Sequence, residues 1–78
     1  MPKETADVIF LDPPYHQGYE KKVLELLRDS QYINEDTLIV IETSLDTSFD
    51  YAETLGFFVE REKLYKTNKH TFLQRILL

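Results

Sequence analysis

The chain has 78 residues, of which 42% are hydrophobic and 29% charged, a balance that predicts one small globular domain and excludes a disordered segment. It contains no cysteine, which excludes disulfides and thiolate metal sites and leads us to expect a cytoplasmic protein. The net charge of −5 argues against a surface that binds nucleic acid over its whole extent. The first residues lack the apolar core of a signal peptide, and the apolar runs are too short to span a membrane.

The first half of the chain predicts a strand, a helix and a second strand. Residues 7–12 contain the run Val-Ile-Phe-Leu and are predicted to form a buried strand. Residues 18–31 are predicted to be a helix, because apolar side chains recur at positions i, i+4, i+7 and i+8. These inward-facing side chains are Tyr19, Val23, Leu26 and Leu27. After a polar turn, residues 37–42 are apolar enough to form a strand that is buried on both faces.

A second helix is predicted to follow. It would begin at Thr47 or Ser48, whose hydroxyl groups can cap a helix. Gly56 suits the C′ position at its other end, because glycine readily adopts the left-handed conformation found there. The inner face of this helix would carry Phe49, Ala52 and Leu55.

The last third of the chain changes to strand patterning. Residues 57–65 and 70–78 are predicted strands, joined by the polar residues 66–69. A link this short favours antiparallel pairing, because a parallel pair needs a long crossover. The sequence therefore predicts an α/β fold of order β-α-β-α-β-β, with three parallel strands, right-handed crossovers and one antiparallel terminal strand.

The tetrapeptide Asp12-Pro13-Pro14-Tyr15 follows the first predicted strand directly. Open α/β sheets build their ligand sites at the carboxyl ends of the strands. The prolines stiffen the loop and lack N–H groups, which leaves carbonyl oxygens free. The Asp12 carboxylate and the Pro13 carbonyl would accept the two hydrogens of an exocyclic amine, while the Tyr15 ring stacks on the extruded base. The alternative is a structural turn, in which Asp12 caps the local backbone and Tyr15 packs in the core.

The segment from Ile9 to Tyr15 resembles motif IV of class I S-adenosylmethionine-dependent amino methyltransferases. With the following helix, the Leu-Ile-Val-Ile-Glu strand and the ending Tyr-Lys-Thr…Thr-Phe, the chain is similar to the RsmD-like family. That resemblance implies methylation of N2 of a guanine in the RNA of the bacterial small ribosomal subunit. It also implies a Rossmann-like sheet in which the last strand inserts between the second and third. The catalytic residues that it implies are Asp12, Pro13, Pro14 and Tyr15.

The resemblance covers nearly the whole chain, but only the carboxyl-terminal half of the family's domain. Class I methyltransferases hold the cofactor on a Gly-rich loop after their first strand, and Gly18 and Gly56 stand in other contexts. Asp12, at the edge of its loop, is the one cofactor contact expected here. Residues 1–78 are therefore interpreted as a single fragment without the cofactor half, and the isolated chain is predicted to be inactive. The bare edge of the 7–12 strand predicts self-association or pairing with the missing half.

The end of the chain carries a local excess of positive charge. Residues 59–78 hold five basic and two acidic side chains, a net charge of +3. This excess predicts phosphate contacts from Lys66, Asn68 and Lys69, although a solvated hairpin would have the same composition.

Three further polar residues are considered as site residues. Two of them, His16 and Glu42, have two interpretations each, and His70 has no predicted catalytic role. His16 is either a catalytic or phosphate-facing residue or an exposed loop residue, and His70, at a strand start, is interpreted as structural. Glu42 ends the second strand at the same edge as Asp12, so it either faces the pocket or is solvated. Two histidines so far apart, in a chain without cysteine, predict no metal site.

Two other functions fit the motif. The same acid-Pro-Pro-Tyr loop occurs in N6-adenine DNA methyltransferases, and related forms act on other amines. A small α/β interaction module without catalytic activity is the third possibility, in which the proline loop has only an architectural role.

Overall fold

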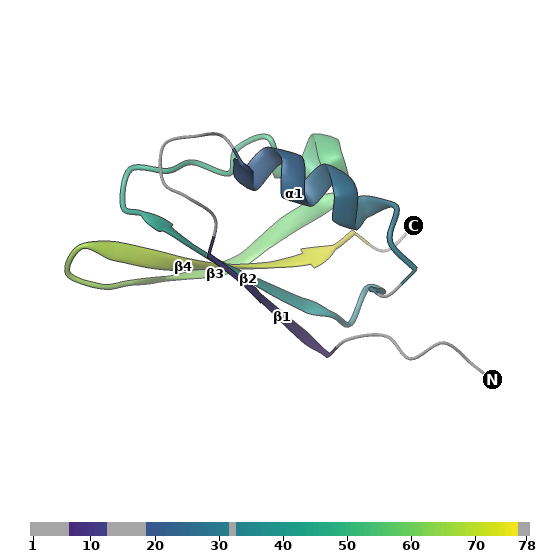
Figure 1. The fold of residues 1–78 in the computed structure, drawn as a ribbon, viewed down its shortest axis with the longest axis horizontal. Helices are drawn as coiled ribbons and strands as arrows, with labels where there is room; N and C mark the ends of the chain where they lie inside the picture. The colour runs from purple at the N-terminus through teal and green to yellow at the C-terminus, as the bar shows by residue number, and fades with distance from the viewer. Residues whose placement is uncertain (1–6, 13–18, 32, 77–78) are drawn as a thin grey trace.

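The computed structural model describes residues 7–12, 19–31 and 33–76. They form a four-stranded sheet with one α-helix and one 3-10 helix on the same side of it (Figure 1). The elements in chain order are β1 (Val8–Leu11), α1 (Tyr19–Arg28), β2 (Leu38–Ser44), η1 (Ala52–Leu55), β3 (Phe57–Leu64) and β4 (Asn68–Arg75). This mixed sheet confirms the predicted α/β class.

The order of the strands in the sheet is β1-β2-β4-β3. β1 pairs with β2 in parallel, and β4 is antiparallel to both β2 and β3. β1, β2 and β3 therefore run in one direction, and the predicted insertion of the last strand between the second and third is confirmed. The turn between β3 and β4 spans residues 65–67, so it begins one residue and ends two residues earlier than the predicted link of residues 66–69. The Tyr65 N–H closes it by donating to the Asn68 carbonyl oxygen at 2.8 Å.

Helix α1 is shorter than the predicted span of residues 18–31 and faces the sheet with a different set of side chains. Leu24 is fully buried, whereas Leu26 is 71% exposed and Tyr19 is 42% exposed. The inward set is Glu20, Leu24 and Leu27, with Val23 beside it. The prediction that Leu26 and Tyr19 face inward was therefore wrong. Successive helical residues are about 100° apart, so an error of a residue or two turns the predicted stripe away from the core.

The two parallel strands of the first half differ in burial. β2 is buried on both faces at Ile39, Val40 and Ile41, as predicted. β1 is not: Val8 and Phe10 are 59% and 53% exposed, while the alternate residues of the strand pack against the core. Among the described residues no element covers the outer face of β1, so the prediction of a fully buried strand was wrong for this chain.

The predicted second helix is a short 3-10 turn instead. Ser48 accepts a hydrogen bond from the Asp50 N–H at 3.2 Å in a local turn, and no side chain caps η1. The inward side of this segment was predicted correctly, because Phe49, Ala52 and Leu55 are all buried. Gly56 has a φ of 88° at the C-cap, as its predicted role requires.

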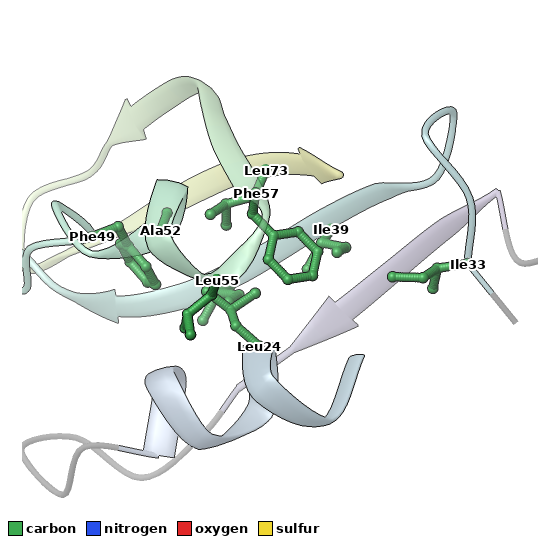
Figure 2. Packing of buried hydrophobic residues seen from close by; sticks show 9 residues of the cluster. Leu24, Ile33, Ile39, Phe49, Ala52, Leu55, Phe57 and Leu73 are labelled. Carbon is green, nitrogen blue, oxygen red and sulfur yellow. The ribbon is translucent and has the colours of Figure 1, made fainter. Parts of the chain in front are cut away.

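One hydrophobic core lies between the sheet and the two helices (Figure 2). In this view Leu24 of α1 lies beside Leu55 of η1, and Phe57 extends from the start of β3 into the same layer. The buried members are Leu24, Ile33, Ile39, Ile41, Phe49, Ala52, Leu55, Phe57 and Leu73. In the described part of the chain, no helix is long and apolar enough to cross a membrane. The core holds β1 and β2 side by side, and their common carboxyl end carries the candidate site.

Candidate functional site

The two parallel strands end at the same edge of the sheet. Leu11 and Ile41 are the last paired residues of the β1–β2 ladder. Asp12 follows Leu11 and is exposed, and Glu42 follows Ile41 and is half-buried. Asp12 and Glu42 therefore follow the end of the β1–β2 ladder together, as expected for parallel strands. The prediction that Glu42 ends the second strand was wrong, because β2 continues to Ser44 in its pairing with β4.

Glu42 is bound to the neighbouring antiparallel strand. It lies opposite His70 in the β2–β4 ladder. Its Oε2 accepts a hydrogen bond from the Asn68 side-chain amide at 2.8 Å, and its Oε1 lies 3.4 Å from the His70 Nε2. Of the two interpretations of Glu42, a freely solvated acid is therefore wrong, because β4 holds its carboxylate in place.

Three rings gather on the same side of the sheet as Glu42. The His70 ring contacts the Phe10 ring edge-on at a centroid distance of 5.3 Å, and it contacts the Tyr65 ring at 4.7 Å. Phe10 stands two residues before Asp12. The ring cluster thus connects the carboxyl end of β1 to the turn between β3 and β4, and His70 is its central member.

Of the predicted catalytic motif, residues 12–15, the structure describes only Asp12. Pro13, Pro14 and Tyr15, and also His16, lie outside the described residues, so the arrangement of two oxygen atoms around an amine stays a prediction. Asp12 is exposed, which leaves its carboxylate accessible to a substrate. Within the described ranges there is neither an enclosed pocket nor a group of acidic and histidine side chains able to hold a metal ion.

The three predicted RNA contacts lie in different environments. Lys66 is exposed in the turn. The Asn68 amide donates to Glu42, as described above, and the Lys69 ammonium is 2.9 Å from the Glu62 carboxylate with only 7% of its side chain exposed. Lys69 therefore belongs to the helix-covered face of the sheet. Of the three, Lys66 alone presents an unburied cationic head group.

Sequence reasoning did not find the ring cluster or the Glu42 contacts. Both depend on the register that places His70 opposite Glu42 and Phe72 opposite Val40. The sequence offered one signal: His70 and Phe72 alternate with residues that are buried. This alternation places both side chains on one face of a strand, but it does not identify the residues opposite them on the neighbouring strands.

Comparison with solved structures defines the class of the fold: the chain corresponds to the carboxyl-terminal part of a Rossmann-like methyltransferase sheet. Over 99% of its length it superposes on 44% of a methylase candidate from Haemophilus influenzae, with a TM-score of 0.74 and 25% identity. It also superposes, over 95% of its length, on 46% of a conserved hypothetical protein from Streptococcus pyogenes, with a TM-score of 0.77 and 26% identity.

Sequence comparison gives the family. Residues 1–74 match the family described as conserved hypothetical protein 95, and the chain belongs to that family. It is 50% identical over 36 residues to Ribosomal RNA small subunit methyltransferase D of Buchnera aphidicola, a match of 46% of this chain and 19% of the relative. It is 33% identical over 69 residues to an uncharacterized methylase of Rickettsia prowazekii, a match of 88% of this chain and 28% of the relative. The predicted RsmD-like resemblance is confirmed.

The chain spans only part of each relative. It covers about a quarter of the curated relatives, 19% and 28% in the two above, and less than half of the solved chains. The activities in the names of the relatives therefore belong to longer proteins than this 78-residue chain.

Proposed function

We propose that this chain is the carboxyl-terminal part of a cytoplasmic S-adenosylmethionine-dependent methyltransferase that modifies N2 of a guanine in small-subunit ribosomal RNA. The observation that carries the proposal is the exposed Asp12 at the carboxyl end of β1, in a chain that belongs to the conserved hypothetical protein 95 family. The name of the Buchnera relative supports an RNA substrate.

In this proposal, residues 12–15 position the target base. The lone pair of an exocyclic amine is delocalised into the ring, which makes the amine a poor nucleophile. A fixed carboxylate at Asp12 and the Pro13 carbonyl would each accept one N–H, aim the lone pair and stabilise the positive charge that develops on nitrogen. Pro14 would keep the loop rigid, and Tyr15 would stack on the base.

The cofactor, S-adenosylmethionine, supplies an electrophilic methyl group when it is bound. In this proposal its principal site lies outside this chain, because the resemblance places the cofactor on a Gly-rich loop after the first strand of the whole domain. Only the edge of the Asp12 loop would touch it. We therefore expect no measurable heat of S-adenosylmethionine binding when the 78-residue chain is titrated alone, and micromolar binding would contradict the assignment of the chain as a fragment without a cofactor half.

The decisive experiment measures methyl incorporation by the intact enzyme that contains these residues. Small ribosomal subunits and duplex DNA are offered in parallel with labelled S-adenosylmethionine. Asp12→Asn should lower turnover on small subunits by about 100-fold or more, the range for loss of a preorganised polar group, while the melting temperature is unchanged. The matched control is Asp36→Asn, which changes an exposed acid in the turn before β2 and should keep full activity.

Each other function has its own outcome in this experiment. Methylation of duplex DNA and not of ribosomal subunits would assign the chain to an adenine-type enzyme. Full activity of Asp12→Asn would indicate that the loop is only architectural, as in an interaction module.

A further inference from the structure

Among the residues that the structure describes, no helix covers one face of the β3–β4 pair. Leu73 belongs to the core on the helix side, so its neighbour Phe72 points to the other side of the sheet. The register places Arg61 opposite Phe72 and Lys63 opposite His70, which puts these four side chains on one surface. We name it the hairpin face; its members are Arg61, Lys63, His70 and Phe72, together with Tyr65, whose ring contacts His70. Lys66 is exposed in the turn beside it.

Rings and cations alternate on the hairpin face. The Arg61 guanidinium lies 4.3 Å from the centre of the Phe72 ring, and the Lys63 ammonium lies 5.6 Å from the centre of the Tyr65 ring. Tyr65 remains 40% exposed. Exposed rings on a sheet, flanked by guanidinium and ammonium groups, are what single-stranded RNA-binding surfaces use to stack bases and contact phosphates.

The acids of this region do not neutralise the hairpin face. Glu62 lies on the opposite face, where it binds Lys69. Glu42 lies on the same side of the sheet as His70 and keeps its negative charge, because the Asn68 amide that it binds is neutral. Glu60 stands at the bulge between Val59 and Arg61 and is exposed. Against these two acids stand the three cations Arg61, Lys63 and Lys66, so positive charge exceeds negative charge by one at and beside the hairpin face, as the complement of a phosphate backbone requires.

We propose that the hairpin face binds the single-stranded RNA that flanks the target base, with Tyr65 stacking on one base and Arg61 and Lys63 contacting phosphates. The inference rests on the proposed RNA substrate and adds the surface that holds it. The contact between the Phe10 and His70 rings makes the hairpin face continuous with the end of β1, so an RNA strand on it would pass next to Asp12.

The test measures equilibrium binding of a fluorescein-labelled 12-nucleotide single-stranded RNA to the intact enzyme by fluorescence anisotropy, over a series of salt concentrations. Tyr65→Leu should weaken binding by about 5-fold to 150-fold, the effect of removing one stacked base, whereas Tyr65→Phe should bind as wild type.

Replacing both cations, with Arg61→Gln and Lys63→Gln, should reduce the slope of log affinity against log salt by about 1.4, since each lost phosphate contact on a single strand removes about 0.7. Lys22→Gln, an exposed cation on α1, is the control and should change neither quantity.

The result separates this inference from the proposed function. The Asp12→Asn variant should lose methyl transfer and keep its affinity for RNA. If this variant remains active, the proposed function is overturned, whereas RNA binding by the hairpin face can still be correct. If Tyr65→Leu and the double cation variant bind RNA as wild type, the hairpin face is not the RNA surface, even where Asp12 is essential. A loss of thermal stability without loss of affinity would show that the rest of the enzyme covers this face, and would also overturn the inference. Tighter binding of the DNA strand of the same sequence would do so as well.

Discussion

The Arg75 guanidinium, at the end of β4, donates a hydrogen bond to the Leu27 carbonyl oxygen in the last turn of α1 at 3.2 Å. The same nitrogen reaches the carbonyl oxygens of Arg28 and Ser30, and the second terminal nitrogen donates to that of Ile33 at 3.1 Å. The last carbonyl groups of a helix have no partners within the helix and carry its negative dipole end. Arg75 satisfies them from a strand 42 to 48 residues away, and so ties the end of the sheet to the end of the helix.

Replacing Arg75 by methionine should destabilise the chain by about 2–4 kcal/mol, because several charge-assisted hydrogen bonds to the carbonyl groups at the end of α1 and in the following turn are lost together. Urea denaturation followed by circular dichroism measures the change. The control is Arg28→Met, which removes an arginine whose side chain is 46% exposed and whose ion pair with Asp29 is 3.7 Å long; it should cost under about 1 kcal/mol. Equal losses in the two variants would show that Arg75 contributes no more than a surface cation.

A second prediction concerns the buried ammonium of Lys69. Its side chain is 7% exposed and bonds to Glu62 at 2.9 Å, while the Glu62 side chain is 38% exposed. Glu62→Gln should destabilise the chain by about 1–3 kcal/mol, less than for a fully buried pair, because it leaves a buried charge with a neutral partner. Thermal melts of this variant are compared with those of Glu60→Gln, an exposed neighbour that should stay within about 0.5 kcal/mol of wild type. Indistinguishable melts would mean that water already solvates the Lys69 ammonium.

The sequence predicted correctly those strands and turns that are determined by residues adjacent to one another in the chain. The apolar run of β2 marks a strand covered on both faces, and the left-handed Gly56 marks the end of η1. The three-residue turn between β3 and β4 permits only an antiparallel pair. The inward face of α1 was misjudged because Leu26 and Leu24 differ in burial only through the orientation of the helix on the sheet, and this orientation is a tertiary property.

The candidate site was predictable at Asp12 and not at its surroundings. A strand followed by an acid places that acid at a sheet edge, whatever the rest of the fold does. The environment of Lys69 depended on the register of β4 instead, because a shift of one residue moves every side chain to the other face. The same register sets the contacts of Glu42 with residues that follow it by more than twenty positions, a distance over which sequence patterns give no pairing information.

A third prediction tests how Glu42 holds β4. Its hydrogen bond with the Asn68 amide is 2.8 Å long and part-buried, so the two residues should be energetically coupled. A double-mutant cycle with Glu42→Ala, Asn68→Ala and the double variant should give a coupling free energy of about 0.5–2 kcal/mol from urea denaturation. Glu42→Gln keeps an oxygen acceptor and should retain part of the coupling.

The matched control pairs Glu35→Ala with Asn68→Ala; Glu35 is an exposed acid in the turn before β2, and additive effects are expected there. Additivity in the Glu42 cycle as well would show that the contact does not stabilise the sheet.

A fourth prediction follows from Tyr51, which lies against the core beside Phe49. Burial, and after it the negative charges of Glu20 and Asp50, together raise the pKa of the Tyr51 hydroxyl from 10.0 to about 12. Above pH 10 the unfolded chain releases this proton while the folded chain retains it, so the unfolded state binds fewer protons and stability falls as pH rises. The contribution of Tyr51 is therefore fully present below about pH 10 and is lost between about pH 10 and pH 12.

Thermal melts of wild type and Tyr51→Phe from pH 8 to pH 12 should differ by a constant amount up to about pH 9, and then converge or cross as wild type alone loses this component. Asp50→Asn should lower the pKa of Tyr51 toward its usual value, which the absorbance of the phenolate measures directly. Stability profiles that stay parallel up to pH 12 would mean that the Tyr51 hydroxyl ionises equally in both states.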